Sequence, residues 1–99
     1  MVWHLYVIRT ASGTLYTGIA TDVGRRYREH LSCGPKAAKY LRACPPKKLV
    51  LARRLGPRPL ALKVEYRFKQ LPKRRKEAIV RAGRLRFDRE SGKILSELF

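Results

Sequence analysis

The chain opens with two runs of apolar and β-branched residues that a turn sequence separates. Residues 2–9 (VWHLYVIR) and residues 14–20 (TLYTGIA) are rich in aromatic and branched side chains, which is typical of β-strands. The intervening residues 10–13 (TASG) are small and polar and end in glycine, a composition that favours a tight turn. The beginning of the chain is therefore predicted to form a β-hairpin.

Two tyrosines in this hairpin, Tyr6 and Tyr16, are ten residues apart. A two-residue loop would place them on opposite faces, whereas a three-residue loop that ends in a left-handed glycine places them on the same face. In that register Tyr6 lies opposite Gly18, and Ile8 lies opposite Tyr16. We therefore expect both phenols on one face as diagonal neighbours, with open space beside Tyr6 because glycine has no side chain.

Helical spacing of apolar residues begins directly after the hairpin. A helix is expected from a cap at Thr21 or Asp22 to about Leu31, with its apolar positions, Leu31 included, facing the core. Arg26 and His30 are four residues apart, so they share one stripe of this helix.

The remaining elements follow from the same rules. A short basic helix is expected over 36–43, and a strand over 48–55 whose continuous apolar centre predicts a central or doubly covered position. Residues 60–71 form an amphipathic helical pattern, and residues 72–82 a basic helix that starts at proline and is closed by glycine. The tail, residues 84–99, has enough apolar content for one more helix.

This order of elements, β-β-α-β-α-α with a minor helix before the third strand, predicts an α+β fold. The expected architecture is a small three-stranded antiparallel sheet flanked by helices. A chain of 99 residues has the length of one domain, which we place at residues 1–83 and follow by a C-terminal tail over 84–99.

Charge narrows the range of functions. The chain has 24 Lys and Arg against 7 Asp and Glu, a formal net charge of +17. Self-repulsion at this charge opposes folding, and solubility alone needs far less, so the excess indicates a polyanionic partner. Nucleic acid fits this best. An acidic membrane surface is a weaker alternative, because no segment combines a basic face with a strong apolar face.

The two cysteines and the absence of a visible leader or membrane span favour the reducing cytosol, where thiols stay free. His30, Cys33 and Cys44 would make a poor zinc site, because the set has three members and no paired spacing.

Five features of the sequence together resemble the GIY-YIG nuclease domain: HLY at 4–6, YTG at 16–18, Arg26, His30 and Glu65. Arg26 follows the glycine of the second motif by eight residues and His30 by twelve, which is similar to the family spacing. Glu65 matches the family's metal-binding glutamate. The resemblance extends over about residues 2–80 and is greatest to the small stand-alone bacterial members.

Three departures from the family pattern stand out. The first motif keeps only its tyrosine, the chain has no asparagine, and no second domain for choosing a target is visible. The last two bear on specificity, so the expected activity is structure-selective or weakly sequence-selective cutting.

The resemblance implies a metal-dependent endonuclease that hydrolyses phosphodiester bonds of DNA. Glu65 would hold one Mg²⁺ or Mn²⁺ ion, which prefers oxygen ligands and keeps most of its waters. Arg26 offers a planar, permanently charged fork for the phosphate. Outside the family pattern, Glu65 would be an ordinary ion-pair partner for Lys63, Arg67 or Lys69.

Either Tyr6 or Tyr16 would accept the proton of the attacking water. A free phenol has a pKa of about 10, so this role requires positive charge nearby. The resemblance implies Tyr6 as the base, with Tyr16 orienting, and His30 is a further group that could relay or take up the proton.

Seven cations are candidates for contacts with the nucleic-acid backbone, which fix position without reading sequence: Lys36, Lys39, Arg42, Lys73, Arg74, Arg75 and Lys76. Tyr40 could stack on an unpaired base. DNA, branched or unbranched, is the expected substrate, with RNA left open. The alternatives are a non-catalytic nucleic-acid-binding module on the same fold and a ribosome-associated basic protein, which rests on charge alone.

Overall fold

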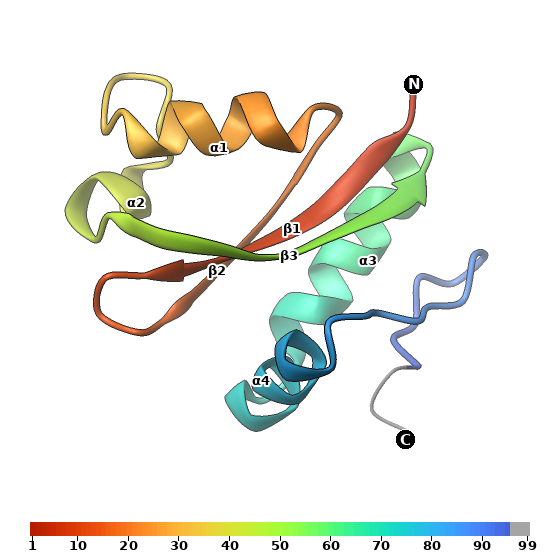
Figure 1. Cartoon of the computed structure of the whole chain (residues 1–99). Helices are drawn as coiled ribbons and strands as arrows, with labels where there is room; N and C mark the ends of the chain where they lie inside the picture. Colours follow the sequence, from red (N-terminus) through yellow and green to blue (C-terminus); the bar gives the residue numbers. More distant parts are fainter. Residues whose placement is uncertain (96–99) are drawn as a thin grey trace.

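A computed structural model describes residues 1–95, and its centre is a sheet of three antiparallel strands (Figure 1). The strands are β1 (Trp3–Thr10), β2 (Leu15–Ala20) and β3 (Pro46–Gly56), in the order β2-β1-β3. Helices pack around this sheet. The α+β class and the three-stranded antiparallel sheet predicted from the sequence are confirmed.

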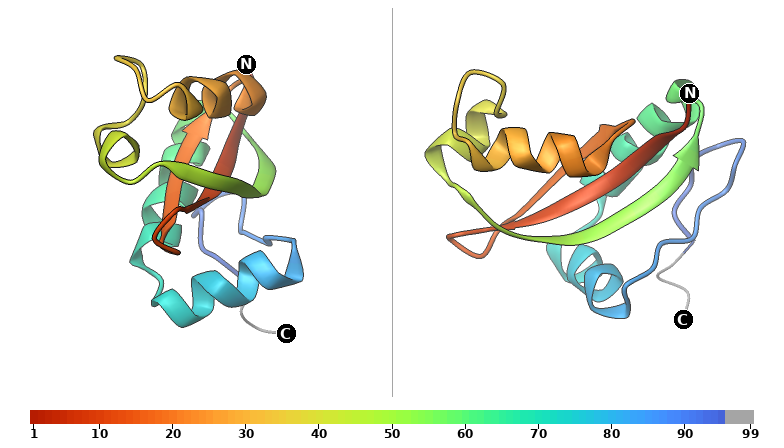
Figure 2. Two further views of the ribbon diagram at one scale, coloured as in Figure 1. Left: turned by 60° about the vertical axis from the view of Figure 1, so that its left-hand side comes forward. Right: turned by 45° about the horizontal axis from the view of Figure 1, so that its top comes forward.

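Helices cover both faces of the sheet, as Figure 2 shows from two further directions. Helix α1 (Val23–Leu31) and the short α2 (Lys39–Ala43) lie on one face, and α3 (Arg58–Gln70) packs across the other. Helix α4 (Lys73–Ala82) follows α3 after a break at Leu71 and Pro72. No helix among residues 1–95 combines the length and the apolar character needed to cross a membrane.

The register of the hairpin is the one that the tyrosine spacing predicts. Tyr6 pairs with Gly18 and Ile8 pairs with Tyr16. The turn ends in Gly13, whose φ of 90° lies in the left-handed region that glycine adopts without steric cost. The space beside Tyr6, however, is not open. A Cβ placed on Gly18 would lie 2.4 Å from the Tyr6 hydroxyl oxygen, so the phenol itself occupies the room that glycine leaves.

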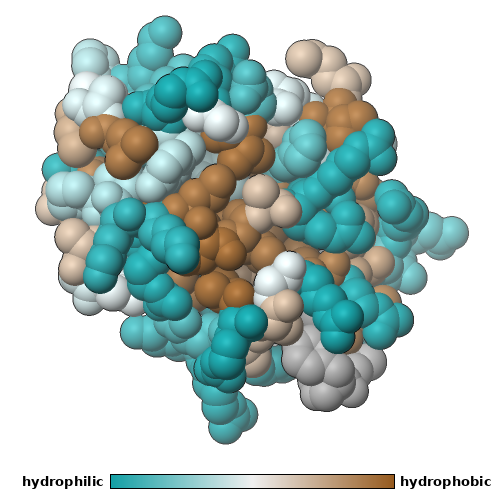
Figure 3. Space-filling model, in the orientation of Figure 1, coloured by the Kyte–Doolittle hydropathy of each residue, from teal (hydrophilic) through white to brown (hydrophobic). Residues whose placement is uncertain are grey.

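Alternation along β1 divides the core into two clusters, one on each face of the sheet. Leu5 and Val7 point to the α3 side, where they meet Val64 and Phe68. Tyr6 and Ile8 point to the α1 and α2 side, with the buried side chains of Ala20 and Leu41. Figure 3 shows that apolar side chains also reach the surface in the middle of one face, surrounded by hydrophilic ones.

Of the two positions predicted for the third strand, the central one is wrong, because β1 lies in the middle and β3 at an edge. The position covered on both faces is confirmed. A register shift pairs Leu51 with Val7 but Leu49 with Ile8, which leaves Val50 in a β-bulge. Val50 and Leu51 therefore pack in the cluster on the α3 side, and Leu49 packs in the one on the α1 side. An unbroken apolar run thus arises in an edge strand.

Helix α1 begins as predicted but buries a different residue at its end. Asp22 caps it, because its carboxylate accepts a hydrogen bond from the Arg25 backbone N–H at 3.0 Å. The expected burial of Leu31 is wrong, since this side chain is 49% exposed and His30 is buried instead. Steps of four residues drift around a helix of 3.6 residues per turn, so the third apolar position falls outside the buried stripe.

Three other boundaries differ from the expected ones. Helix α2 begins at Lys39 and not at 36, because the backbone groups of Lys36 and Ala38 bond to side chains of α1. Helix α3 begins at Arg58, with proline in its first turn. Residues 84–95 contain no helix: Phe87 and Ile94 form an isolated antiparallel bridge, and residues 96–99 lie outside the described part of the chain.

Candidate active site

Three rings from three elements meet on the α1 side of the sheet. Tyr6 comes from β1, Tyr16 from β2 and His30 from the last turn of α1. The ring centroids of Tyr6 and Tyr16 are 6.4 Å apart, and His30 lies 5.8 Å from the first and 5.6 Å from the second. The predicted hairpin register and the helical position of His30 together produce this cluster.

A hydrogen bond of 2.9 Å joins the Tyr6 hydroxyl to Nε2 of His30, and both side chains are buried. The other ring nitrogen, Nδ1, accepts a hydrogen bond from the Ala38 backbone N–H at 3.2 Å. A backbone amide can only donate, so Nδ1 carries a lone pair and the proton of the neutral ring sits on Nε2. His30 therefore donates to the Tyr6 oxygen and is not arranged to accept its proton.

Burial lowers the pKa of His30, and the neighbouring Arg26 cation lowers it further. Both effects keep the imidazole neutral, in agreement with its two hydrogen bonds. Burial also raises the pKa of Tyr6 to about 12, and Tyr16 raises it as well, whereas Arg26 acts in the opposite direction. In the protein without substrate the Tyr6 phenol is consequently protonated at neutral pH.

Arg26 lies at the edge of this cluster, and its guanidinium is anchored at one nitrogen. Nη1 donates to a carboxylate oxygen of Glu29 at 2.9 Å and to the backbone carbonyl of Lys36. Both of these bonds use the same end of the fork, and a hydrogen bond between the guanidinium and the Tyr6 phenol helps to lower the pKa of Tyr6, so the guanidinium adjoins that phenol. Glu29 is thus a positioning partner that the sequence pattern did not single out, although its i,i+3 spacing from Arg26 was visible.

Glu65 lies in the middle of α3 with its side chain 19% exposed, and it is ion-paired to Lys69 at 3.3 Å. Its negative charge contributes to the raised pKa of Tyr6, and Arg26 changes that same pKa. Glu65 thus lies within electrostatic range of the phenol on which Arg26 also acts. The ordinary ion pair expected for Glu65 is present too.

The donor set suits a hard divalent cation that keeps most of its water ligands. Glu65 supplies one carboxylate, and residues 1–95 hold no group of three His, Cys, Asp or Glu side chains that could enclose a metal. Mg²⁺ is commonly bound by one or two carboxylates together with substrate phosphates, so a single carboxylate beside a phosphate site fits it. A zinc site at His30 does not fit, because both ring nitrogens are used within the protein.

A hollow of about 310 Å³ adjoins Tyr16, and its lining combines aromatic and cationic side chains. Tyr40 stacks nearly parallel on Tyr16, with centroids 6.1 Å apart and an interplanar angle of 13°. Its hydroxyl is bonded to that of Thr14 at 2.7 Å, and 46% of the residue is exposed. Lys69 and Lys76 also line it, together with Leu15 and Thr17. The place of Lys69 beside Tyr16 was not predicted, because it depends on how α3 crosses the sheet.

The seven cations proposed for backbone contacts divide into two groups. Lys73 and Lys76 of α4 line hollows next to β2, and Arg74 and Arg75 belong to the same helix. The other three lie on the α1 and α2 side, where a second hollow is lined by side chains of α1 and the loop after it: Lys36, Lys39 and Arg42. The candidate active site therefore has basic surface on two sides.

Comparison with known proteins assigns the chain to a family. The sequence profile of the GIY-YIG catalytic domain matches residues 2–78. The chain belongs to the GIY-YIG family. GIY-YIG proteins are generally endonucleases that act on DNA, and the tyrosine, arginine and glutamate positions described above all fall within the matched residues.

Similar GIY-YIG chains include small bacterial proteins of nearly the same length. The UPF0213 protein YhbQ of Salmonella typhimurium is 55% identical over 78 residues, which cover 79% of this chain and 76% of the relative. The protein of the same name from Escherichia coli is 54% identical over 81 residues, 82% of this chain and 79% of the relative. A UPF0213 protein of Bacillus halodurans, solved by NMR, is 36% identical with a TM-score of 0.53 and covers 83% and 85% of the two chains.

Proposed function

We propose that this GIY-YIG protein is a metal-dependent endonuclease that hydrolyses phosphodiester bonds of DNA with structure selectivity or weak sequence selectivity. The observation that carries the proposal is the meeting of Tyr6, Tyr16 and His30 on one face of the sheet, with the buried Tyr6–His30 hydrogen bond at its centre. Arg26 and Glu65 support it, because the charge of each acts on the pKa of Tyr6. The free thiols of Cys33 and Cys44 suit a protein that works in the cytosol.

The residues divide the work of hydrolysis between them. Arg26 binds the non-bridging oxygens of the scissile phosphate through the nitrogens that Glu29 leaves free. Tyr6 must first release its own proton to solvent, once positive charge at the site lowers its pKa. The phenolate then accepts the proton of the attacking water, and the Nε2–H of His30 stabilises that phenolate by donating to its oxygen. Tyr16 orients the water beside it. His30 is in this account a positioning residue for Tyr6, acting through a hydrogen bond.

Glu65 would hold one Mg²⁺ or Mn²⁺ ion, whose charge polarises the phosphate when it is bound. The lysine partner of Glu65 must then give way, which is cheap because Lys69 is about half exposed. The raised pKa of Tyr6 means that the proposed base becomes effective only when positive charge arrives with the substrate complex. In the protein without substrate the Tyr6 phenol therefore keeps its proton.

DNA is the proposed partner, gripped by the cations on both sides of the centre. Such contacts hold the backbone without reading bases, in keeping with weak sequence selectivity. Tyr40, stacked on Tyr16 and partly exposed, provides a flat surface for a base near the scissile bond.

The direct test is nicking of supercoiled plasmid and cleavage of branched DNA by the parent, by Tyr6→Phe and by Tyr27→Phe. Tyr27 packs in the same cluster as Tyr6, so the control removes a comparable hydroxyl outside the proposed chemistry. We expect loss of at least about 100-fold for Tyr6→Phe, the scale of a lost general base, and near-parental rates for Tyr27→Phe. Full activity of Tyr6→Phe would remove Tyr6 from the base role.

A second function, a non-catalytic DNA-binding module, is favoured by one observation. Both charged groups of the centre already have protein partners: Glu29 binds Arg26, and Lys69 binds Glu65. In that case DNA binding would persist in EDTA, and no cleavage would follow when Mg²⁺ or Mn²⁺ is added. The same titration with duplex DNA, branched DNA and RNA distinguishes the two functions.

A further inference from the structure

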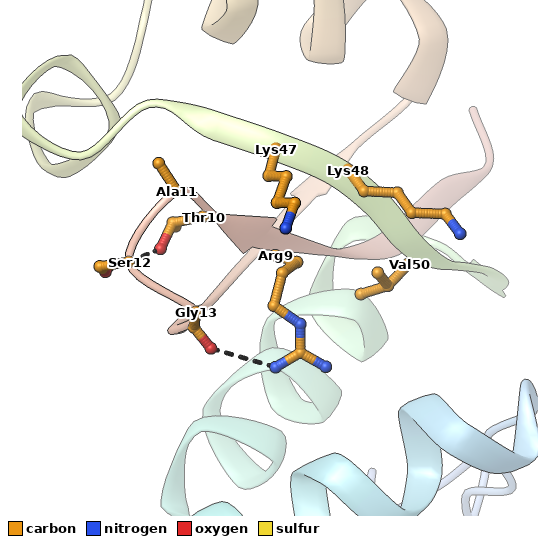
Figure 4. A pocket seen from close by; sticks show the side chains of 8 residues that line it. All are labelled: Arg9, Thr10, Ala11, Ser12, Gly13, Lys47, Lys48 and Val50. Atoms are coloured by element: carbon orange, nitrogen blue, oxygen red, sulfur yellow. Dashed lines mark hydrogen bonds between the residues drawn. The ribbon is translucent and has the colours of Figure 1, made fainter.

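A further basic hollow, of about 490 Å³ and separate from those described above, lies at the tip of the hairpin (Figure 4). Its walls are the end of β1, the turn that follows and the beginning of β3. Figure 4 shows lysine side chains of β3 on one wall and an arginine of β1 on the other. The lining residues are Arg9, Thr10, Ala11, Ser12, Gly13, Lys47, Lys48 and Val50.

The hairpin hollow carries an excess of positive charge, which comes from its lysines and not from its arginine. Arg9 is neutralised, because its guanidinium binds both carboxylate oxygens of Glu77 and also donates to the Gly13 carbonyl at 3.1 Å. Lys47 and Lys48 are exposed and take part in none of the three ion pairs found among residues 1–95. No acidic residue lines the hollow. Two lysine charges therefore remain available to an anion.

The floor of the hollow is fixed before any ligand arrives. The Gly13 backbone N–H donates to the Thr10 carbonyl at 2.9 Å, and the Ala11 N–H donates to the Pro45 carbonyl at 2.9 Å. The second bond ties the hairpin turn to the beginning of β3, next to Lys47. A ligand would thus bind a preformed shape and would not have to order the turn.

The hollow continues a row of depressions that starts at the candidate active site. The depression beside Tyr16 shares Leu15 and Lys76 with the next one, which is also lined by Lys73 and Thr14. Thr14 is the chain neighbour of Gly13, which lines the hairpin hollow. Each of these three depressions contains lysine, and none contains an acidic residue.

We propose that the hairpin hollow is a second phosphate-binding site, in which Lys47 and Lys48 hold backbone phosphates of the same polynucleotide whose scissile bond lies at Tyr6. This inference rests on the proposed function for the identity of the ligand. It assigns a role to two lysines outside the seven cations considered from the sequence. The polynucleotide then follows β2 from Tyr16 past α4 and around the hairpin turn.

The test is the affinity for DNA oligonucleotides of increasing length, measured by fluorescence anisotropy in EDTA so that no cleavage occurs. The double variant Lys47→Gln/Lys48→Gln is compared with the parent and with Lys63→Gln/Lys93→Gln. The control removes the same charge from two exposed lysines on the other side of the molecule, near the C-terminal segment. All four positions are exposed, so folding should survive each change, and circular dichroism checks it.

We expect the shortest oligonucleotides to bind the three proteins equally. With length, parental affinity should rise in a step that the Lys47/Lys48 variant lacks and the control keeps. For long DNA the slope of log Kd against log salt should fall by about 1 to 2 in the variant, since each phosphate contact contributes about 0.7 to 0.9. Equal loss in variant and control, or an unchanged length step, would overturn the proposal.

Two further arms separate the possible failures. If the parent cleaves DNA and the variant keeps the length step, the second site fails and the nuclease stands. If the parent never cleaves but the step is lost in the variant, the site stands and the nuclease fails. In the second arm, inorganic phosphate is added while the amide NMR signals of Gly13 and Lys47 are followed. If these signals saturate but the DNA series shows no length step, the hollow is a site for a free anion and the polynucleotide proposal is overturned.

Discussion

At the scale of single residues, the bond between His30 and Tyr6 decides what each can do. The Ala38 amide occupies Nδ1, so His30 is a donor, and burial keeps it neutral. An NMR titration of the His30 ring should give a midpoint below the usual value of about 6.5. His30→Gln, which keeps a side-chain donor, should retain more activity than His30→Ala. Equal loss in both would contradict a donating role.

The lowered pKa of His30 also makes folding depend on pH. The unfolded chain binds a proton at His30 more readily than the folded one, so the free energy of unfolding decreases as the pH falls through the unfolded value and below it. Above that window the stability is fully present. Urea unfolding at pH 7.5 and at pH 5 should therefore show a loss that is smaller in His30→Gln. A parallel pH dependence in the two proteins would sink this attribution.

Gly18 offers a sharper residue-scale test, because the Tyr6 ring occupies the place of a Cβ. Its hydroxyl oxygen and ζ carbon would lie 2.4 and 2.6 Å from that Cβ, so Gly18→Ala must displace the ring from His30. We expect destabilisation of about 1–3 kcal/mol, as for other overpacked sites, together with loss of cleavage. In a Tyr6→Ala background, Gly18→Ala should cost no further stability, because no ring then opposes the added methyl group, and activity should stay absent; denaturant unfolding and plasmid nicking measure the two effects.

At the scale of elements, one ion pair fastens α4 to the hairpin. Glu77 binds Arg9 through both oxygens, one at 2.7 Å, and Arg9 lowers the pKa of Glu77. Because the folded pKa is depressed, the stabilisation is present above the unfolded value of about 4.3 and is lost as the pH falls through the folded one. Glu77→Gln should cost about 1 kcal/mol at pH 7, and the two proteins should converge in stability near pH 3.

The elements that local pattern decides were predictable from the sequence, and those that tertiary contacts decide were not. The spacing of Tyr6 and Tyr16 fixes the hairpin register, and the cap at Asp22 fixes the start of α1. The apolar run of β3 fits an edge strand because a bulge at Val50 turns the run to both faces, and this bulge leaves no compositional signal. Helix α2 starts late because Ala38 bonds to His30, a contact between residues eight apart that periodicity does not reveal.

The candidate site divides in the same way. Family spacing pointed to Tyr6, Arg26 and Glu65, and the charges of Arg26 and Glu65 both act on the pKa of the Tyr6 phenol. The direction of the His30 hydrogen bond and the stacking of Tyr40 on Tyr16 depend on three-dimensional placement. Neither could be derived from spacing along the chain.

At the scale of the whole molecule, the net charge of +17 should dominate DNA binding. Each phosphate that a Lys or Arg neutralises releases counterions, so affinity falls steeply with salt. If about six cations contact phosphates, affinity should drop about 1,000-fold between about 50 and 200 mM salt. A shallow dependence, measured by anisotropy in EDTA, would show that few of these cations touch the backbone.

The central claim is that Glu65 belongs to a phosphate-cutting centre and is not merely a partner for Lys69. The most direct measurement is single-turnover DNA cleavage with Mg²⁺ or Mn²⁺ by the parent, by Glu65→Gln and by Glu77→Gln, a second part-buried, ion-paired glutamate outside the centre. We predict loss of at least about 100-fold for Glu65→Gln, unchanged DNA affinity in EDTA and near-parental cleavage by Glu77→Gln. Parental cleavage by Glu65→Gln would contradict the account.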